Sequence, residues 1–349
     1  MDKWTGLCFN PLDTLFFRDG KPFGTADKAQ TRNLPMPQTT AGAVRTWLME
    51  SLGCDFEGLA DSAEFTRVMQ DVSFRGPWFM LEDELLFPVP ATLVETEDCE
   101  IQALKPLDTS KTPLPGWEPA DGMKPLWRKD SKPAKRLSKP FIKLSGMKTF
   151  LGGGVPGKED FVSADEVYGH DRRTGIGVDK NTLTAEDGQI YAVNLLALKD
   201  KVSLYMEVTA PKDISEILPT KENPSVIKLG GEGRYAQFHR VNDPALNFGD
   251  VERNRENGAM LVLLTPGLFN GWKPAMLNGN LISAAVPGYE AVSGWDLKKG
   301  GPKPNRFAVS AGSVYFVDKQ LGQNIGSLCD GEDARLGYGI YAEGRFDYA

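Results

Sequence analysis

The sequence predicts an α+β fold, and three observations support this prediction. A strand-like run near the N-terminus is followed by a helical pattern at residues 35–53 and by two β-rich runs at residues 73–94. This order is the front half of a β-α-β-β-α-β unit. A new β-rich run begins at residue 201, which is consistent with a second α+β domain that resembles the first. The length of 349 residues also suggests about two domains.

The helix expected at residues 35–53 has an entrance that suits a phosphate. Apolar residues recur there at helical spacing, and Thr39 or Thr40 can serve as the N-cap. The entrance reads Gln-Thr-Thr-Ala-Gly, with Arg45 just inside the helix. Free backbone N–H groups, small side chains and one arginine at a helix N-terminus can hold a phosphate.

Composition excludes several classes of protein. The net charge of −7 argues against a generally basic nucleic-acid binder, although a local basic groove remains compatible with it. The four cysteines form no C-x-x-C pair, so neither a zinc site nor a disulfide framework is indicated. We find no secretion signal and no apolar run long enough for a membrane span. We therefore expect a cytoplasmic protein without a cofactor or a membrane partner.

Residues 95–157 form an expected insertion that carries a basic island. Prolines are frequent in this region and long apolar runs are absent. Between residues 124 and 148, nine cations face a single acid, Asp130. The basic island consists of Lys124, Arg128, Lys129, Lys132, Lys135, Arg136, Lys139, Lys143 and Lys148. Two interpretations stay open: a solvated surface insertion, or a contribution to anion binding.

Two strand-like arms at residues 172–191 flank a tip rich in Thr, Asp, Asn and Gly, which predicts a projecting β-hairpin. We place a domain boundary near Leu198, just after this hairpin. The preceding GHDRR motif brings His170 next to Arg172 and Arg173. The chain has only two histidines, so a histidine-rich metal cage or a histidine-paired nucleophile has little to draw on.

Three glycine-rich segments are candidates for ligand binding. Residues 152–159 nearly match the P-loop pattern, but Glu159 stands where a magnesium-binding hydroxyl is required, and a simple turn is the alternative. Residues 228–240 place Gly230, Gly231 and Gly233 before Arg234 and Tyr235. There the backbone and the arginine can grip a phosphate while the tyrosine stacks on a base. Residues 335–345 form a second segment of this kind.

Five stretches together resemble the family that forms the third subunit of the Cmr complex, a RAMP-superfamily protein of the type III-B CRISPR effector. They are NPLDTLFFRDGKPFG (10–24), MPQTTAGAVR (36–45), RRTGIGVDKNTLTAEDGQIY (172–191), KLGGEGR (228–234) and LGYGIYAEGRF (336–346). The first and third stretches are the most specific, and the glycine-rich loop is shared by RAMP proteins generally.

The resemblance implies two ferredoxin-like, RRM-like RAMP domains. They correspond here to residues 1–198, with the insertion at 95–157 and the hairpin at 172–191, and to residues 199–349. It implies a non-catalytic subunit that caps the 5′ repeat-derived tag of the crRNA. It also implies contacts with the large polymerase-like subunit and with the adjacent backbone RAMP subunit, while target RNA is contacted only indirectly.

The resemblance further implies which residues contact RNA. In RAMP proteins the loop that enters the first helix contacts the RNA backbone, and a thumb-like hairpin crosses the guide and kinks it. The expected RNA-binding residues are Arg18, Gln38, Thr39, Thr40, Arg45, His170, Arg172, Arg173, Thr174, Gly175, Ile176, Gly230, Gly231, Gly233, Arg234 and Tyr235. Arg172 and Arg173 would pair with phosphates beside the kink, and Ile176 would wedge beside a displaced base.

Two alternative functions remain at this point. One is a guide-processing endoribonuclease of the same superfamily. Such enzymes usually carry a histidine for acid–base work, and the helix at residues 35–53 contains none. The other is a nucleotide-binding regulator that uses residues 152–159, which is the weaker candidate because the P-loop match is incomplete.

Overall fold

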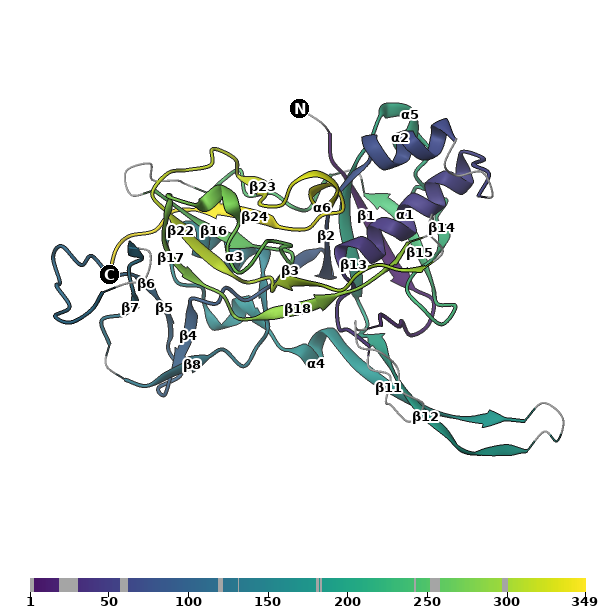
Figure 1. Cartoon of the computed structure of the whole chain (residues 1–349), viewed down its shortest axis with the longest axis horizontal. Coiled ribbons are helices and arrows are strands. Elements are labelled where there is room, and N and C mark those ends of the chain that lie inside the picture. The colour runs from purple at the N-terminus through teal and green to yellow at the C-terminus, as the bar shows by residue number, and fades with distance from the viewer. Residues whose placement is uncertain are drawn as a thin grey trace. The chain divides into compact units, whose positions relative to one another are not determined.

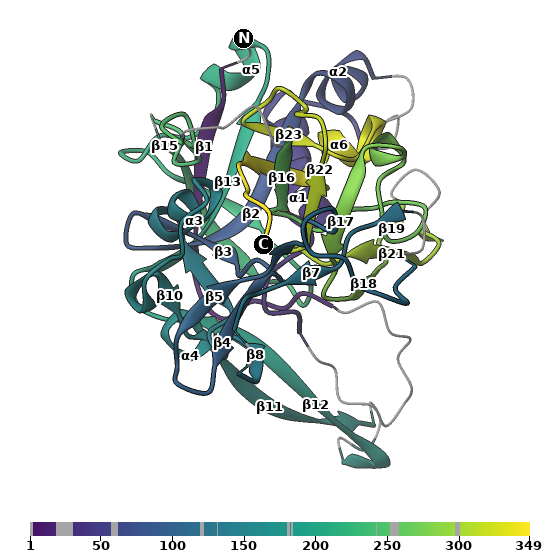
Figure 2. The same ribbon diagram turned by 90° about the vertical axis from the view of Figure 1, so that its left-hand side faces the viewer.

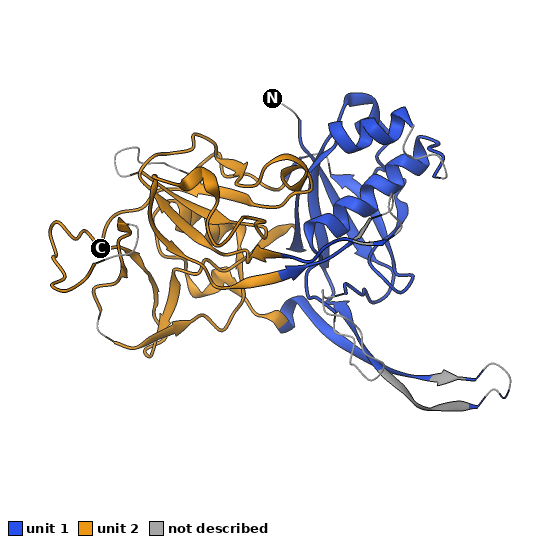
Figure 3. Ribbon diagram, in the orientation of Figure 1, with its two compact units in different colours: residues 1–82, 165–244, 291–306 blue, residues 83–164, 245–290, 307–349 orange. Residues whose placement is uncertain are grey.

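A computed structural model describes residues 3–18, 31–56, 62–118, 122–130, 132–179, 182, 184–241, 243–251, 258–296 and 301–349. The chain divides into two compact units, each assembled from separated stretches (Figure 3). Unit 1 comprises residues 1–82, 165–244 and 291–306, and unit 2 comprises residues 83–164, 245–290 and 307–349. Among the described residues, no helix is long and apolar enough to cross a membrane.

Unit 1 is built on an antiparallel sheet with helices on one face (Figure 1). Its strands are β1 (Thr5–Pro11), β2 (Ser73–Leu81), β13 (Val202–Thr209), β14 (Ser225–Lys228) and β15 (Tyr235–Val241). They lie in the order β2-β13-β1-β15-β14. Three helices connect them: α1 (Pro37–Ser51), α2 (Ala63–Asp71) and α5 (Lys212–Glu216). Taken as the first to fourth strands, β1, β2, β13 and β15 have the arrangement of a β-α-β-β-α-β unit.

Two predictions about this unit need correction. The sequence pattern assigned the third strand to the run after β2, but β13 pairs with both β1 and β2 and lies between them. All but one of its residues are buried, as expected for a strand with neighbours on both sides. The boundary near Leu198 therefore falls inside unit 1 rather than between two domains.

Helix α1 confirms the pattern at residues 35–53, but its entrance differs from the prediction. Met36 is the N-cap and its side chain makes no capping hydrogen bond, while Pro37 opens the helix. Proline suits this position because its φ is already helical and the missing N–H would be unpaired anyway. Trp47 packs edge-on against Phe238 with ring centroids 5.1 Å apart, which fixes α1 on the sheet.

The predicted hairpin is present and is longer than expected. Strands β11 (Tyr168–Val178) and β12 (Ala185–Leu198) pair in antiparallel register and project from the sheet of unit 1 (Figures 1 and 2). At the root, Leu15 and Leu196 exchange two backbone hydrogen bonds of 2.8 Å. Residues 180, 181 and 183 of the predicted tip lie outside the described residues.

Unit 2 repeats the strand order of unit 1. Its main strands are β16 (Ala259–Leu263), β17 (Leu281–Ala285), β22 (Val314–Val317), β23 (Ile325–Ser327) and β24 (Ile340–Gly344), in the order β17-β22-β16-β24-β23. Only the short helices η4 (Ala275–Leu277) and α6 (Gly331–Arg335) occupy the two helical positions. Both units are thus mixed α/β assemblies with antiparallel sheets.

The expected insertion at residues 95–157 is folded and belongs to unit 2. Its described part and the segments around it contain short strands and one two-turn helix, α3. These elements are β3 (Glu84–Pro88), β4 (Leu93–Thr96), β5 (Ile101–Ala103), β6 (Lys105–Pro106), β7 (Leu126–Trp127), β8 (Ala134–Arg136), β9 (Phe141–Lys143), α3 (Leu144–Leu151), η3 (Lys158–Asp160), β10 (Phe161–Val162) and α4 (Ala164–Val167).

A β-ribbon follows β17. It consists of β18 (Tyr289–Val292), β19 (Trp295–Asp296), β20 (Gly301–Pro302) and β21 (Arg306–Val309). In this ribbon β18 pairs with β21 and β19 pairs with β20. Residues 291–306 of the ribbon group with unit 1 rather than with unit 2.

Candidate nucleic-acid interface

An open cleft of about 1260 Å³ lies in unit 1 beside α1 and the strand β14. Four segments that are distant in the sequence line it: residues 16–18, α1 with the segment before it, β14 with the glycine-rich loop, and residues 291–294 together with 303–305. Three of these segments belong to stretches that the sequence analysis singled out, at residues 10–24, 36–45 and 228–234. The fold therefore brings separate candidate motifs into one place.

The cleft concentrates positive charge in an acidic protein. Its charged lining consists of Arg18, Arg32, Lys228 and Lys303, against the single acid Glu50. The chain as a whole has a net charge of −7. Because walls of one charge sign focus the local potential, this cleft favours an anionic ligand.

Aromatic rings accompany these cations. Tyr235 is 48% exposed and lies directly across from Lys228 in the register of β14 and β15. The Trp47 indole donates a hydrogen bond to Ser225 Oγ at 3.0 Å, which holds its ring against the strand. An exposed aromatic ring beside a lysine can stack on a base while the ammonium group contacts a phosphate.

Glycines allow the loop before β15 to lie against the segment at residues 16–18. The Gly231 N–H donates to the carbonyl oxygen of Phe16 at 2.9 Å. Gly230 has φ +88°, and a Cβ there would lie 2.4 Å from the same oxygen. Only glycine permits this approach, so the loop and the Arg18 motif depend on each other.

Arg234 and Arg173 meet at one carboxylate. Asp13 lies 2.8 Å from Arg234 and 3.7 Å from Arg173, which also pairs with Asp171 at 2.8 Å. A backbone hydrogen bond at Thr14, together with the two guanidinium charges, lowers the pKa of Asp13. This carboxylate links the root of the hairpin to the glycine-rich loop through its pairs with Arg173 and Arg234.

Two predicted RNA contacts need correction. Arg45 is only 3% exposed and donates to the carbonyl oxygens of Met69 and Val72, both at 3.2 Å, while its guanidinium lies over the Phe74 ring. Thr40 is fully buried and its hydroxyl donates to the carbonyl oxygen of Pro37. Both side chains stabilise the fold of unit 1 and neither reaches the cleft.

The other predicted residues at the helix entrance lie at the cleft. Thr39 lines it directly, and Gln38 donates to the carbonyl oxygen of Ser293 at 2.5 Å. Arg32 likewise donates to the carbonyl oxygen of Ala291. The entrance of α1 thus anchors residues 291–294, which form one wall.

The hairpin residues form a separate group. Arg172, Arg173 and Thr174 are exposed along β11, and Ile176 is 52% exposed. Gly175 is half-buried between them. His170 shares a hydrogen bond of 3.0 Å with Asn33 Oδ1. None of these residues lines the cleft as described.

Sequence reasoning missed part of the lining. Arg32, Lys303 and Asn305 carry no motif, and residues 291–294 and 303–305 reach the cleft only through folding. Lys228 opens the glycine-rich stretch, so its position could have been inferred from that motif. The signal available in the sequence was that Lys228 and Tyr235 flank the glycine-rich stretch.

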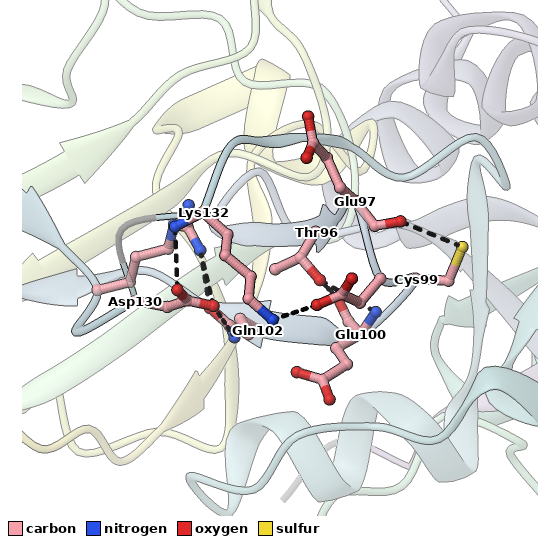
Figure 4. Close-up of polar contacts among 9 residues, drawn as sticks. Thr96, Glu97, Cys99, Glu100, Gln102, Asp130 and Lys132 are labelled. Atoms are coloured by element: carbon pink, nitrogen blue, oxygen red, sulfur yellow. Dashed lines mark hydrogen bonds and ion pairs between the residues drawn. The ribbon is translucent and has the colours of Figure 1, made fainter.

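The basic island is largely paired within unit 2. Lys132 pairs with Asp98, Arg128 lies 3.8 Å from Asp130, and Figure 4 shows this polar cluster. Gln102 donates to Asp130 at 3.3 Å and accepts from Arg128 at 3.0 Å. Further cations of the island have partners: Lys124 with Tyr348, Lys135 with Glu95, Arg136 with the Pro287 carbonyl, Lys139 with the Phe161 carbonyl and Lys148 with Asp250. The interpretation as a folded surface element is therefore favoured over an anion site.

The P-loop-like segment forms no phosphate cradle. The N–H groups of Gly152, Gly153 and Gly154 donate to carbonyl oxygens of α3. The Gly157 N–H donates to Asp160 Oδ2 at 2.9 Å. Within the described part of the chain, no group of three or more His, Cys, Asp or Glu residues could hold a metal ion.

Comparison with known proteins identifies the family. The family model for CRISPR-associated protein (Cas_Cmr3) matches residues 7–345. The chain belongs to this Cmr3 family. No curated protein matches the chain.

Two solved structures show the fold of this Cmr3-family chain. One is a cryo-EM structure of the type III-B Cmr-beta bound to cognate target RNA and AMPPnP, with 18% identity and a TM-score of 0.55. The other is the type III-B Cmr-beta bound to cognate target RNA, with 17% identity and a TM-score of 0.54. Each match covers 89% of this chain and 86% of the matched chain. The resemblance to the third Cmr subunit is thereby confirmed.

Proposed function

We propose that this Cmr3-family chain is the RNA-binding subunit of a type III-B CRISPR effector complex that holds the 5′ repeat-derived tag of the crRNA in the cleft of unit 1. The observation that carries the proposal is the charge of this cleft, where four cations face one acid in a protein of net charge −7. Phosphate contacts from Lys and Arg supply most of the affinity for single-stranded RNA.

The fold of each unit fits this role. We assign units 1 and 2 as two ferredoxin-like RAMP domains because both have the same strand order. The cleft belongs to the first of them, where the glycine-rich loop precedes the fourth strand. Family membership further supports docking to the large polymerase-like subunit and to the adjacent backbone subunit, with target RNA contacted indirectly.

The hairpin is assigned as a thumb that crosses the guide RNA. Arg172, Thr174 and Ile176 alternate along one face of β11 and are all exposed. This face pairs a cation for phosphates with an apolar side chain that can stack beside a displaced base. Deleting residues 177–187 and closing the arms with a glycine linker changes the chemical reactivity of the guide nucleotide next to the tag if the thumb kinks the RNA there.

The subunit is proposed to bind RNA without cleaving it. Neither histidine of the chain lines the cleft, so the cleft offers no imidazole for acid–base catalysis. The alternative is a guide-processing endoribonuclease. Incubation of the purified full chain with repeat RNA separates the two, because specific cleavage would support the enzyme.

The salt dependence of RNA binding tests the proposed function. The affinity of the full chain for single-stranded tag RNA is measured over a series of salt concentrations, with the wild type and with Lys228→Ala and Lys303→Ala. Each lost phosphate contact lowers the slope of log affinity against log salt by about 0.7 for a single strand.

Lys201→Ala is the matched control for these variants. Lys201 is exposed in unit 1, pairs with Glu82 at 2.8 Å and does not line the cleft. This substitution leaves the slope at the wild-type value. Equal slopes for all three variants and the wild type would contradict a phosphate-binding cleft.

A further inference from the structure

The outer edge of strand β14 presents unpaired main-chain groups to the cleft. The Leu229 N–H donates to the Arg234 carbonyl oxygen at 2.9 Å, so these two residues face each other as a hydrogen-bonded pair. Ile227 faces Ala236 two residues further along. Hydrogen-bonded and non-hydrogen-bonded pairs alternate in an antiparallel ladder. The N–H and C=O groups of Val226 and Lys228 therefore point away from β15.

No described residue pairs with these groups. β14 ends the strand order in unit 1, and no further strand among the described residues lies beyond it. Val226 is 51% exposed, and Val226, Ile227 and Lys228 all line the cleft. Proteins usually cover, bend or charge such an edge because it invites pairing with another molecule. Here the open edge lies in a cleft that is lined by four cations.

We propose that the outer edge of β14 reads the Watson–Crick edge of one unpaired nucleotide of the bound RNA. This inference rests on the proposed function, since it requires RNA in the cleft. Val226 offers one N–H donor and one C=O acceptor on the same side of the strand. Each nucleobase presents an adjacent donor and acceptor on its Watson–Crick edge, and unstacked RNA bases are commonly read through that edge.

The surroundings of β14 favour a nucleotide over a peptide. An added peptide strand is the other common occupant of an open edge. However, the cleft places Lys228, Arg18 and Lys303 around this edge, and these charges complement a polyanion. Tyr235, which faces Lys228 across the strand pair, provides a ring on which the base that is read or its neighbour can stack.

A proline substitution tests the edge directly. Val226→Pro removes one outward N–H and no ladder hydrogen bond, and proline is tolerated on edge strands in this orientation. Val226→Ala is the matched control because it shortens the side chain and keeps the N–H. Unfolding of both variants is measured to establish that the strand is intact. Val226→Pro is expected to weaken binding of the tag RNA by about threefold to tenfold relative to Val226→Ala.

Modified RNAs identify the nucleotide without altering the protein. A panel of tag RNAs carries one methyl group at a time on the Watson–Crick edge of each base, which keeps the phosphates and the stacking surface. Methylation at one position is expected to weaken binding to the wild type by about tenfold. The same methyl group has no further effect on Val226→Pro, because the contact that it blocks is already lost. A photoreactive thio-base at that position should cross-link to residues 225–229.

Each outcome bears on the proposal. A methyl penalty that persists in Val226→Pro, equal penalties at all positions, or a cross-link elsewhere would overturn it. If Val226→Pro does not fold, the methyl profile and the cross-link on the wild type still decide the question. Normal RNA recognition with loss of a neighbouring subunit would instead assign the edge to a protein strand. Absence of RNA binding by the wild type would contradict the proposed function itself.

Discussion

The two units share a strand order but use the glycine-rich loop before the fourth strand in opposite ways. In unit 1 this loop follows β14, and Lys228 and Tyr235 at its two ends are exposed. In unit 2 the corresponding loop follows α6, and Leu336 and Tyr338 are buried. The same chain geometry therefore forms an exposed rim of the cleft in one unit and a part of the core in the other.

Two glycines make this difference concrete. Gly233 has φ +63° and a Cβ there would meet no atom within 4 Å. Gly339 has φ +67°, but a Cβ there would lie 2.7 Å from Cys329 Sγ and 2.9 Å from the Cys329 backbone nitrogen. The buried Thr265 hydroxyl donates to the Gly337 carbonyl oxygen at 2.7 Å and further fixes the loop of unit 2. The comparison of these two loops shows that a glycine-rich motif alone does not distinguish an exposed loop from a packed one.

The helix that follows the first strand also differs between the two units. Unit 1 has the 15-residue helix α1, whereas unit 2 has the three-residue helix η4. Gly42, Ala43 and Thr46 of α1 line the cleft, so the long helix supplies a wall that the short helix of unit 2 is too short to provide. The two units therefore share a strand order but differ in the length of the helix that follows the first strand.

The largest expected effect comes from the two glycines. Gly339→Ala adds a methyl group against backbone and lowers the free energy of unfolding by about 2–4 kcal/mol. Gly233→Ala adds only left-handed backbone strain and costs about 1 kcal/mol. Denaturant titration of both variants measures the difference. Equal costs would show that the loop of unit 2 is not packed as described.

The second prediction compares how the buried Arg45 and the exposed Lys228 affect stability and RNA affinity. Arg45→Ala leaves the carbonyl groups of Met69 and Val72 without their donor and lowers the free energy of unfolding by about 2–3 kcal/mol. The RNA affinity of the folded variant stays at the wild-type value. Lys228→Ala gives the reverse pattern, with lower affinity and nearly unchanged stability. Loss of RNA affinity in folded Arg45→Ala would return that residue to the binding site.

A smaller effect is expected at Asp13. Asp13→Asn removes the carboxylate that competes with phosphate for Arg173 and Arg234, so RNA affinity rises by about twofold to fivefold. The pKa of Asp13 is lowered in the folded protein, so its stabilising contribution is present above its ordinary pKa and is lost as the pH falls through the lower value. The stability difference between wild type and variant therefore shrinks below about pH 4. Weaker RNA binding by the variant would show that Asp13 orients the arginines instead of competing for them.

The smallest effect is expected in the basic island. Lys132 and Lys135 pair with Asp98 and Glu95. The double variant Lys132→Ala, Lys135→Ala leaves the salt slope of RNA binding unchanged, because neither cation releases counterions from the RNA. Comparison with Lys228→Ala in the same titration provides the contrast. A lower slope for the double variant would place RNA on unit 2.

Local patterns predicted the elements that depend on local sequence. The helix predicted at residues 35–53 is confirmed as α1. Its apolar residues recur at helical spacing, so the sequence alone indicates the face that is buried. The hairpin was confirmed because alternating arms flank a polar tip. Both elements form through contacts between residues that are near one another in the chain.

The remaining features depend on contacts between distant segments. β13 was assigned to a second domain because residues 82–201 separate it from its partner β2. Arg45 was interpreted as a phosphate ligand because the Met69 and Val72 carbonyls that hold it come 24 and 27 residues later. The wall at residues 291–305 carries no motif at all. This segment groups with unit 1, where Arg32 and Gln38 donate hydrogen bonds to its backbone.

Cross-linking of tag RNA in the reconstituted complex tests the central claim most directly. RNA substituted throughout the tag with photoreactive thio-bases is irradiated, and the cross-linked peptides are identified by mass spectrometry. We predict cross-links to residues 16–18, 226–228, 230–231 and 235, which line the cleft of unit 1. Cross-links concentrated at residues 124–148 or 335–341, with none at the cleft, would contradict it.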